Sequence, residues 1–445
     1  MKYQRSLSPV QPETEIMTGW RRTALIIVLF MVSAFSQIDR ILPFILAESI
    51  KKELHLSDTQ LGLITGIAFA VIYSIASLPL ARLADRGASK QVLVWCILIW
   101  SLMTGLGGLA VGFVTMAISR FGVALGEAGG TPAAHALIAG KIPELRRGRA
   151  IGIFSMGIPL GTMVGFTAGG WASDHVGWRV ALFVAGGVGL LLVILVMAFS
   201  GKMTITSQRA HSTGNIWSAG RALLSKPAFL WMFIGANFLG FAAAPFYAFT
   251  APFLIRTHAL TASQVGLSFG LLQGLMGILG TVVGGRLFDR AVKRGKGRLL
   301  DPPAFVFGLA SVTTLAGFLA PEGWMAIALF VPGMLAFAFL LPYAFGAGHL
   351  IAGPGKQALS SSLLMIASGL LGPALSPLIV GLISDTTSAT YGVNGLRWGM
   401  MVVPVASLLS SIAIFIASRQ IKLYLSGKYA KNTLLHSADK PSIVK

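Results

Sequence analysis

Charged residues are scarce in this chain of 445 residues, since only 11% are Asp, Glu, Lys or Arg while 55% are hydrophobic. A soluble domain of this length needs far more charge to cover its surface, so the composition excludes a soluble globular protein and is typical of a membrane protein. Cysteine is nearly absent as well. Cys96 is the single one, which excludes an internal disulfide and a cysteine metal cluster.

Signals of enzymatic chemistry are also missing. Gly266-Leu-Ser-Phe-Gly270 matches the G-x-S-x-G pattern, but it lies in a predicted membrane helix rather than in a strand–turn–helix elbow. The histidines are solitary, and no phosphate-binding P-loop is present, so we expect no metal, no cofactor and no ATP-driven reaction. The net charge of +20 comes from residues scattered between apolar runs, which argues against a nucleic-acid-binding stripe.

Long apolar runs dominate the sequence. Runs of about twenty residues, long enough to cross a bilayer, start near twelve positions: Thr23, Thr59, Gln91, Phe113, Ala150, Trp178, Phe229, Ser263, Pro302, Trp324, Ala358 and Gly395. The first run follows a basic stretch and is too long for a cleavable signal, so we expect it to remain as a transmembrane helix. The sequence therefore predicts an all-α membrane protein with twelve spans.

The distribution of basic residues predicts the orientation. Twelve spans place both termini on one side, and most of the 35 Lys and Arg residues lie in loops on that side. Two, Arg40 and Arg120, lie within spans, and five lie in loops on the opposite side: Lys51, Lys52, Arg179, Arg256 and Arg397. The positive-inside rule then predicts a multi-pass protein of a bacterial-type inner membrane with both termini in the cytoplasm.

The chain divides into two similar halves. We predict a cytoplasmic N-terminal segment (1–22), a six-helix bundle (23–200), a polar cytoplasmic linker (201–226), a second six-helix bundle (227–418) and a basic tail (419–445). Ala81-Arg-Leu-Ala-Asp-Arg86 follows the second span, and Gly285-Arg-Leu-Phe-Asp-Arg290 follows the eighth, its counterpart in the second half. Repeated halves are typical of transporters with a site near the membrane midplane.

Four charged residues lie inside predicted spans, where charge is costly and marks function by default: Asp39, Arg40, Arg120 and Glu127. Arg120 and Glu127 are seven residues apart and share a helix face. Asp39 and Arg120 lie at similar depth, so we expect a network across the first and fourth spans. One interpretation is that these charges only neutralise each other and fasten two helices together.

The other interpretation is proton coupling, because hydration and a neighbouring arginine change the protonation of a buried carboxylate as access alternates. Glu127 is the first choice as proton carrier, since it lies nearer the midplane and next to Gly126 and Gly129, which leave space around it. Asp39 is the second. For Asp85, Arg86, Asp289 and Arg290, which recur at equivalent helix ends of the two halves, we predict a role in gating.

The second half shows no clear ionisable residue at mid-membrane depth. Its seventh and tenth spans are instead rich in aromatic residues, and we expect an aromatic cavity wall there, with Asn237, Tyr247 and Tyr343 as candidate lining residues. Gly157, Gly161, Gly165 and Gly169 form a ridge on the fifth span. We expect this ridge to pack against a helix of the other bundle, and Gly62 and Gly66 to act likewise.

These features resemble the major facilitator superfamily over nearly the whole chain. Its signature Gly-x-x-x-Asp-Arg-x-Gly-Arg-Arg/Lys is similar to Ala81-Arg-Leu-Ala-Asp85-Arg86-Gly-Ala-Ser-Lys90, although the first glycine is alanine and the distal part is shifted. Gly157-Ile-Pro-Leu-Gly161 looks like the antiporter-type motif of that superfamily. The resemblance implies two pseudo-symmetric six-helix bundles and, by default, a monomer.

Within the superfamily the chain resembles the Spinster family. Asp39-Arg40 and Arg120-Phe-Gly-Val-Ala-Leu-Gly-Glu127-Ala match its pattern Arg-x-x-x-Gly-x-Gly-Glu-Ala except at Ala124, and Gly177-Trp178-Arg179 also fits. The resemblance implies a proton-linked carrier that works by alternating access, with Asp39, Arg40, Arg120 and Glu127 as coupling residues. Eukaryotic relatives carry sphingosine-1-phosphate or lysophospholipids.

The sequence thus predicts a secondary transporter, and its expected partners are protons, membrane lipids and a small amphipathic substrate. A carrier of sugars or organic acids is the main alternative within the superfamily. A membrane-embedded enzyme would need a clustered nucleophile or metal set, and a receptor would not need paired halves with buried charge. Both are the less favoured classes.

Overall fold

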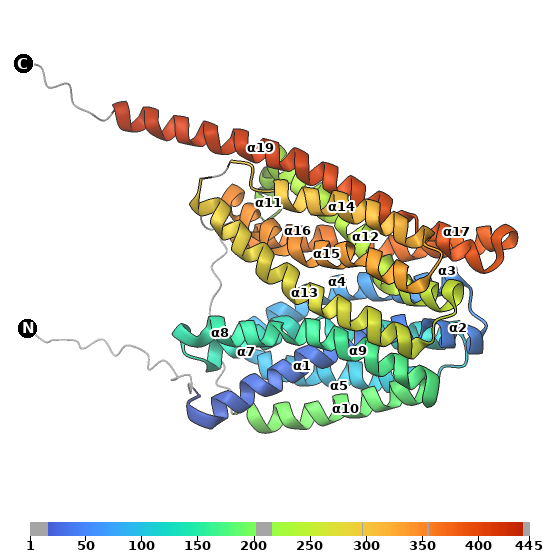
Figure 1. Ribbon diagram of the computed structural model, residues 1–445. Helices are drawn as coiled ribbons and strands as arrows, with labels where there is room; N and C mark the ends of the chain where they lie inside the picture. The colour runs from blue at the N-terminus through green and yellow to red at the C-terminus, as the bar shows by residue number, and fades with distance from the viewer. Residues whose placement is uncertain (1–16, 202–215, 296, 354–355, 439–445) are drawn as a thin grey trace, which may run out of the picture.

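The computed structural model describes residues 17–201, 216–295, 297–353 and 356–438 (Figure 1). Within these residues the secondary structure is helical and contains no strand. Parts of three predicted segments lie outside the described residues, namely 1–16 of the N-terminal segment, 202–215 of the linker and 439–445 of the tail. The predicted domain boundaries stay a prediction.

The first half of the chain folds into ten helices: α1 (Gly19–Ile45), α2 (Ala47–Leu54), α3 (Asp58–Thr65), α4 (Ile67–Leu83), α5 (Ser89–Gly107), α6 (Phe113–Glu127), α7 (Gly130–Lys141), α8 (Glu144–Ser155), α9 (Gly157–His175) and α10 (Trp178–Phe199). A short turn, η1 (Ala84–Ala88), joins α4 to α5. It contains Gly87 at φ 97°, a left-handed conformation that glycine adopts without strain.

The second half contains α11 (Ile216–Leu224), α12 (Pro227–His258), α13 (Ala262–Lys293), α14 (Asp301–Leu319), α15 (Gly323–Ala352), α16 (Gln357–Ile366), α17 (Gly372–Tyr391), α18 (Gly395–Gly399) and α19 (Val402–Ala438). The irregular turns η2 (Ala367–Leu371) and η3 (Gly392–Asn394) flank α17.

Nine apolar helical stretches of the described chain are long enough to cross a membrane. Two of them, Asp58–Gly107 and Leu359–Leu423, each contain two of the predicted spans. The predicted fourth span is not among the nine, because it is divided between α6 and α7 and carries Arg120 and Glu127. With these three additional spans, the structure agrees with the predicted twelve, and the all-helical fold is confirmed.

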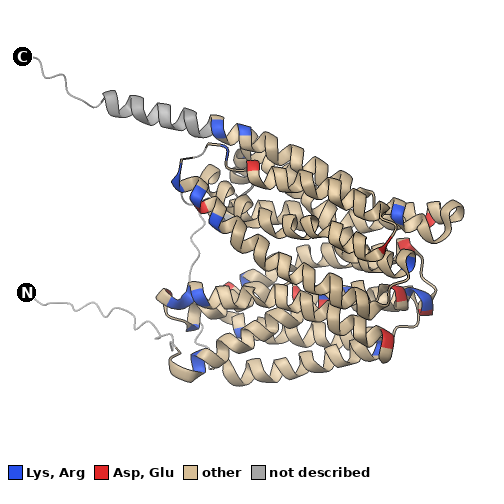
Figure 2. Ribbon diagram, in the orientation of Figure 1, with Lys and Arg blue, Asp and Glu red and all other residues tan. Residues whose placement is uncertain are grey.

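The helices form two groups that lie side by side, α1–α10 in blue to green and α11–α19 in light green to red (Figure 1). Helix α1 begins and α19 ends at the same end of the molecule, which we call the terminal end. Helix α2 and the C-terminal end of α17 lie at the opposite end, which we call the far end. Lys and Arg gather at both ends (Figure 2).

Buried apolar residues show where the two groups are joined. Far-end residues of the first group, such as Ile45, Leu61 and Phe166, belong to the same buried cluster as the aromatic core of the second group. Terminal-end residues of the first group, such as Leu25 and Val196, form a separate cluster. The two halves therefore share one core at the far end and have separate cores at the terminal end.

Two helix pairs make most of the contact between the groups, α9 with α13 and α3 with α17. A Cβ atom on Gly62 would lie within 2.9 Å of the α17 backbone at Leu378, and one on Gly66 would lie 2.9 Å from the Pro373 carbonyl oxygen. Small residues thus allow these backbones to meet. The expectation that Gly62 and Gly66 pack against the other half is confirmed.

The expected partner of the α9 glycine ridge was wrong. Gly157 and Gly161 meet Ser33, Ala34 and Gln37 of α1, and the later members of the ridge, Gly165 and Gly169, meet α1 at Ile41 and Ile45. The ridge therefore packs inside the first group. Another face of α9 meets α13, where a Cβ on Gly170 would lie 3.2 Å from the Gly266 Cα.

Candidate functional site

A cavity of about 780 Å³ lies between the two groups of helices. This volume is in the range of pockets that hold small organic ligands. Arg40, Phe69 and Arg120 line it from the first group, and Tyr247 and Gln273 line it from the second. It extends toward the terminal end, where Ser155 of α8 and Thr281 of α13 contribute to its wall. The remaining lining residues are mostly apolar.

The four predicted membrane charges come together across α1 and α6. Arg40 Nε donates to Glu127 Oε2 and forms an ion pair with it, which joins the first and fourth spans as expected. Asp39 has no ion pair within the described residues, but Glu127 and Arg120 are the charged groups that act on it electrostatically. The structure thus brings all four side chains together, and we call these four residues the buried cluster.

The two arginines of the buried cluster face the cavity across an aromatic ring. The guanidinium carbons of Arg40 and Arg120 lie 5.1 Å and 5.6 Å from the centroid of Phe69, and Arg40 also lies 4.7 Å from the ring of Tyr73. These distances allow cation–π attraction. Within the described residues Arg120 forms no ion pair, although it is only 6% exposed.

The two carboxylates lie behind the arginines. Asp39 and Glu127 are 1% and 2% exposed, and neither lines the cavity. Asp39 Oδ1 and Glu127 Oε1 have no hydrogen-bond partner among the described residues. Gly126 and Gly129 do not leave space around Glu127, because a Cβ on either would meet Cys96 of α5. Both carboxylates are therefore shielded from the cavity, whose wall is formed here by Arg40 and Arg120.

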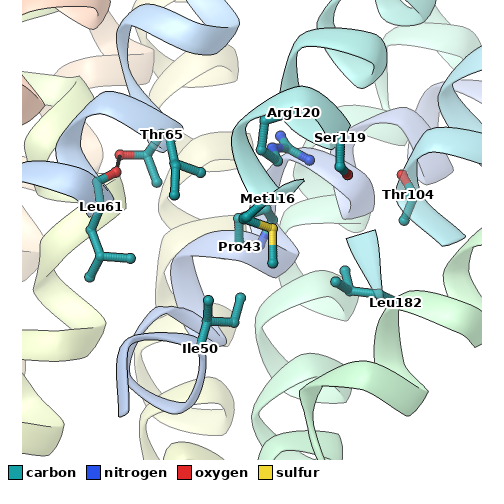
Figure 3. Close-up of a pocket in the computed structure, with 10 residues that line it drawn as sticks. Pro43, Ile50, Leu61, Thr65, Thr104, Met116, Ser119, Arg120 and Leu182 are labelled. Atoms are coloured by element: carbon teal, nitrogen blue, oxygen red, sulfur yellow. Dashed lines mark hydrogen bonds between the residues drawn. The ribbon is translucent and has the colours of Figure 1, made fainter. Parts of the chain in front are cut away.

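A small pocket adjoins Arg120 and shares Pro43 and Thr65 with the main cavity (Figure 3). Thr104, Ser119 and Arg120 bring polar groups to it, and apolar side chains such as Met116 and Leu182 complete its wall. Its volume of about 20 Å³ is enough for one water molecule. Arg120 Nε has no hydrogen-bond partner among the described residues.

The predicted aromatic wall is mostly absent from the cavity. Phe246 packs against Phe269, Phe330 and Phe337 in the core of the second group, and of these four rings Phe337 alone is also among the cavity residues. Among the three candidates, Tyr247 lines the cavity.

The other two candidates are corrected by the structure. Tyr343 is fully buried against Phe288 and Phe339, so it packs in the core of the second group. Asn237 is half-buried on α12 and is not among the cavity residues, although its neighbours Leu239 and Gly240 are.

A second set of charges, not singled out from the sequence, connects the two groups at the far end. Arg256 of α12 donates to Asp58 of α3 through Nη1 at 2.7 Å and Nη2 at 3.0 Å, and to Glu48 of α2 at 2.9 Å. Lys51 Nζ also reaches Asp58 at 2.5 Å, and Ser384 of α17 donates to it at 2.6 Å. Asp58 is 1% exposed.

Asp385 of α17 adds a helix cap from one group to the other. Its carboxylate accepts hydrogen bonds from the backbone N–H groups of Asp58 and Thr59 at 2.9 Å and 2.8 Å, and from the Thr59 hydroxyl at 2.6 Å. A carboxylate at a helix N-terminus is favourable because it satisfies free N–H groups and faces the positive end of the helix dipole. We call Glu48, Asp58, Arg256 and Asp385 the far-end cluster.

The far-end cluster was missed because its members look like ordinary loop charges. Two signals in the sequence point to it: Asp58 starts an apolar run, and Asp385 follows Gly381-Leu-Ile-Ser inside one. Asp58 is buried and Asp385 is half-buried, and a charge that is removed from water needs a partner.

A third far-end contact stays within the first group. Trp178 Nε1 donates to Glu53 Oε2 at 2.6 Å and Arg179 Nε donates to Glu53 Oε1 at 2.9 Å. The hydrogen bond from Trp178 and the charge of Arg179 lower the pKa of Glu53 below its usual value. Arg179 also donates to the carbonyl oxygens of Gly108 and Ala110, so this contact fastens three loops of one group.

The predicted gating residues lie at the terminal end. Asp85 and Arg86 are exposed in η1, and Asp289 and Arg290 are exposed near the end of α13. In the part of the chain that the structure describes, none of these four residues forms an ion pair. Their gating role stays a prediction.

Comparison with known proteins shows which family the chain matches. The model of the Major Facilitator Superfamily matches residues 25–377. The chain is 33% identical to an MFS-type efflux pump of Mycolicibacterium smegmatis, over 90% of this chain and 94% of the pump. It is 24% identical to the probable galactarate/D-glucarate transporter GudP of Escherichia coli, over 94% of this chain and 97% of that protein.

A solved structure is similar over most of the chain. It is a crystal structure of a bacterial homologue of the human lysosomal transporter Spinster in an inward-facing and occupied conformation. The TM-score is 0.79 at 26% sequence identity, with 91% of this chain and 98% of that chain covered. The predicted resemblance to Spinster is confirmed, and the similar proteins named above are transporters rather than enzymes.

Proposed function

Because the chain belongs to the major facilitator superfamily, we propose that it is a proton-coupled secondary transporter that moves a small amphipathic substrate by alternating access. The observation that carries this proposal is the arrangement of the site. Two arginines line a cavity between the halves, and two buried carboxylates lie directly behind them. Such an arrangement links the contents of the cavity to the charge state of the carboxylates.

The terminal end is the cytoplasmic end in this proposal. Support comes from the excess of Lys and Arg in loops on that side and from the positive-inside rule. The protein then resides in the inner membrane of a bacterial-type cell, and its cavity opens to the cytoplasm. The shared core and the far-end cluster close the periplasmic side.

An amphipathic substrate suits the wall of the cavity. Most of its lining is apolar, and its two cationic side chains, Arg40 and Arg120, lie on one side. Apolar lining removes an acyl or aryl chain from water. Arg120 forms no ion pair within the described residues, so an acidic group of the substrate gains a strong charge-assisted contact there.

In this proposal Arg40 couples substrate binding in the cavity to proton exchange at the carboxylates. In the observed conformation Arg40 is held by Glu127, whereas no arginine forms an ion pair with Asp39 within the described residues. A substrate group that draws Arg40 into the cavity releases Glu127, which then exchanges a proton as the cavity changes sides. Asp39 is the candidate to hold the proton in this conformation, and Glu127 takes it in the other.

Separation of the two groups at the far end completes the cycle. The contacts of Arg256 and Asp385 break, and the terminal end closes through the loops that carry Asp85, Arg86, Asp289 and Arg290. The two groups move as bodies around the cavity, as expected for transporters with repeated halves. A single chain suffices for this cycle, so we propose a monomer.

Uptake into proteoliposomes tests the proposal. The purified protein is reconstituted, a pH gradient is imposed, and the movement of a labelled lysophospholipid, a sugar and a dicarboxylate is measured. We expect the lysophospholipid to move faster with the gradient and to lose this acceleration when a protonophore is added. Equal movement with and without the gradient contradicts proton coupling.

A carrier of organic acids is the second candidate. It is favoured by two cationic side chains in one cavity and by similarity to a protein named as a galactarate/D-glucarate transporter. The same experiment separates the two candidates, because this one requires gradient-driven movement of the dicarboxylate and none of the lysophospholipid.

A further inference from the structure

Two polar side chains of the second group lie in the cavity wall without an assigned role. Gln273 of α13 donates from Nε2 to the hydroxyl oxygen of Tyr247 of α12 at 2.6 Å. Gln273 is 2% exposed, and its Oε1 has no hydrogen-bond partner within the described residues. Both side chains line the main cavity, and neither carries a charge.

The pair presents one acceptor and one donor. Because the Tyr247 oxygen accepts from Gln273, the Tyr247 hydroxyl proton is free to point elsewhere. The acceptor that the pair offers to a ligand is Gln273 Oε1. A buried amide oxygen without a partner is costly, so a group that satisfies it binds favourably.

Helix α9 shows that this pair and the arginines lie at the same depth. A Cβ on Gly161 of α9 would lie 2.8 Å from Gln37 Cβ, and one on Gly165 would lie 3.0 Å from Ile41 Cβ. Arg40 lies between Gln37 and Ile41 on α1, so it is level with this part of α9.

The same helix locates Gln273. A Cβ on Gly274 of α13 would lie 2.9 Å from the Pro159 carbonyl oxygen, and Gly270 meets Phe166. Gln273 is therefore level with residues 159–166 of α9, as Arg40 is. One layer of the cavity has a cationic side and a neutral hydrogen-bonding side.

We propose that Gln273 and Tyr247 form a subsite that recognises a hydroxyl group of the substrate. A hydroxyl group can donate to Gln273 Oε1 and accept from Tyr247 Oη at once, through a single atom. The substrate is then an amphiphile with an acidic group near Arg40 and Arg120 and a hydroxyl group facing α12 and α13. This inference rests on the proposed function and narrows its substrate class.

Equilibrium binding of four matched amphiphiles tests the subsite. The probes are decanoate and its 3-, 6- and 10-hydroxy derivatives, which share chain length and charge and differ by one hydroxyl group. Binding is measured with the full-length protein in lipid nanodiscs, and binding to protein-free nanodiscs is subtracted. We expect at least one hydroxydecanoate to bind about tenfold more tightly than decanoate, as two neutral hydrogen bonds provide.

Two variants assign the preference to the pair. Gln273→Met keeps the length of the side chain, Tyr247→Phe removes only the hydroxyl, and each is expected to reduce the preference to about threefold or less. Ser268→Ala is the matched control, because Ser268 is half-buried on the same helix, does not line the cavity, and its hydroxyl donates to the Gln264 carbonyl at 2.6 Å. It is expected to keep the full preference.

The possible outcomes are distinct. Equal affinity of the wild-type protein for decanoate and all three derivatives overturns the subsite but leaves the proposed amphipathic substrate intact. A preference that survives in both Gln273→Met and Tyr247→Phe also overturns it. Failure of all four probes to bind contradicts the proposed substrate class itself, and with it the subsite that rests on it.

Discussion

The buried cluster and the far-end cluster contain the same kinds of side chain but are placed differently with respect to the two groups of helices. Asp39, Arg40, Arg120 and Glu127 all belong to the first group, whereas Arg256 and Asp385 of the second group bind α2 and α3 of the first. Charges inside one group can exchange partners without moving the groups. Charges that bridge the groups have to separate whenever the groups separate.

This difference leads to a division of labour. We expect changes in the buried cluster to alter the energy source of transport while the populations of the two conformations stay similar. We expect changes in the far-end cluster to alter those populations. Four substitutions test the division, and they are given from the largest expected effect to the smallest.

The largest effect is expected for Glu127→Gln. Glutamine keeps the shape but cannot release a proton or form the ion pair with Arg40. Substrate uptake driven by a pH gradient should fall to the level of protein-free liposomes, while exchange of substrate across the membrane without a gradient persists. Uptake with unchanged pH dependence would show that Glu127 is not the proton carrier.

Arg256→Ala is expected to open the far end. It leaves Glu48 and Asp58 without their arginine, although Asp58 keeps Lys51 and Ser384. Loss of a partly compensated buried pair costs about 2 kcal/mol, which corresponds to about a thirtyfold shift toward the conformation with an open far end. Spin labels at Leu109 and Val393, both exposed at the far end, should report longer distances. An unchanged distance distribution contradicts the bridging role.

Asp385→Ala should have a smaller effect of the same kind. It removes the cap that α17 provides to α3, but Ser57 still accepts from Gln60 N and caps the same helix. Loss of such a cap costs about 1 kcal/mol, or about a fivefold shift in population. The same spin-label pair measures it. A shift as large as that of Arg256→Ala would mean that the cap, rather than the ion pair, holds the far end closed.

Glu53→Gln is expected to leave the conformational populations unchanged. Its partners Trp178 and Arg179 belong to the same group of helices, so the contact does not break when the groups separate. Because the pKa of Glu53 is lowered, any stabilisation from its charge is present above the usual glutamate range and disappears as the pH falls below it.

Thermal unfolding of the wild-type protein and of Glu53→Gln measures this contribution. The small difference in Tm should be visible at pH 7 and vanish near the lowered pKa. A shift of the spin-label distances in this variant would remove the distinction between contacts within a group and contacts between groups.

Sequence patterns predicted the spans and the buried cluster well, for a physical reason. Apolar runs need a bilayer, and a charge within such a run is anomalous, so Glu127 and Arg40 stand out in the sequence. Depth along a helix follows from the rise per residue, and it brought Asp39 and Arg120 to the correct level.

Lateral neighbours could not be predicted in the same way. The spacing of Gly157 to Gly169 defines a face of α9 but not the helix that meets it, and the structure places α1 there. An aromatic residue such as Tyr343 fits a core as well as a cavity wall. Asp58 and Arg256 are 198 residues apart and lie where charges are common, so only the packing of α3 against α17 and of α2 against α12 reveals their contact.

The single thiol of the chain has a practical consequence. Cys96 is 3% exposed, and it packs inside the first group against Gly129. A water-soluble maleimide should therefore leave the wild-type chain unlabelled, which makes it a ready background for introduced cysteines. If the two groups rock as rigid bodies, Cys96 stays unreactive throughout turnover, and its alkylation during transport would reveal that the first group itself comes apart.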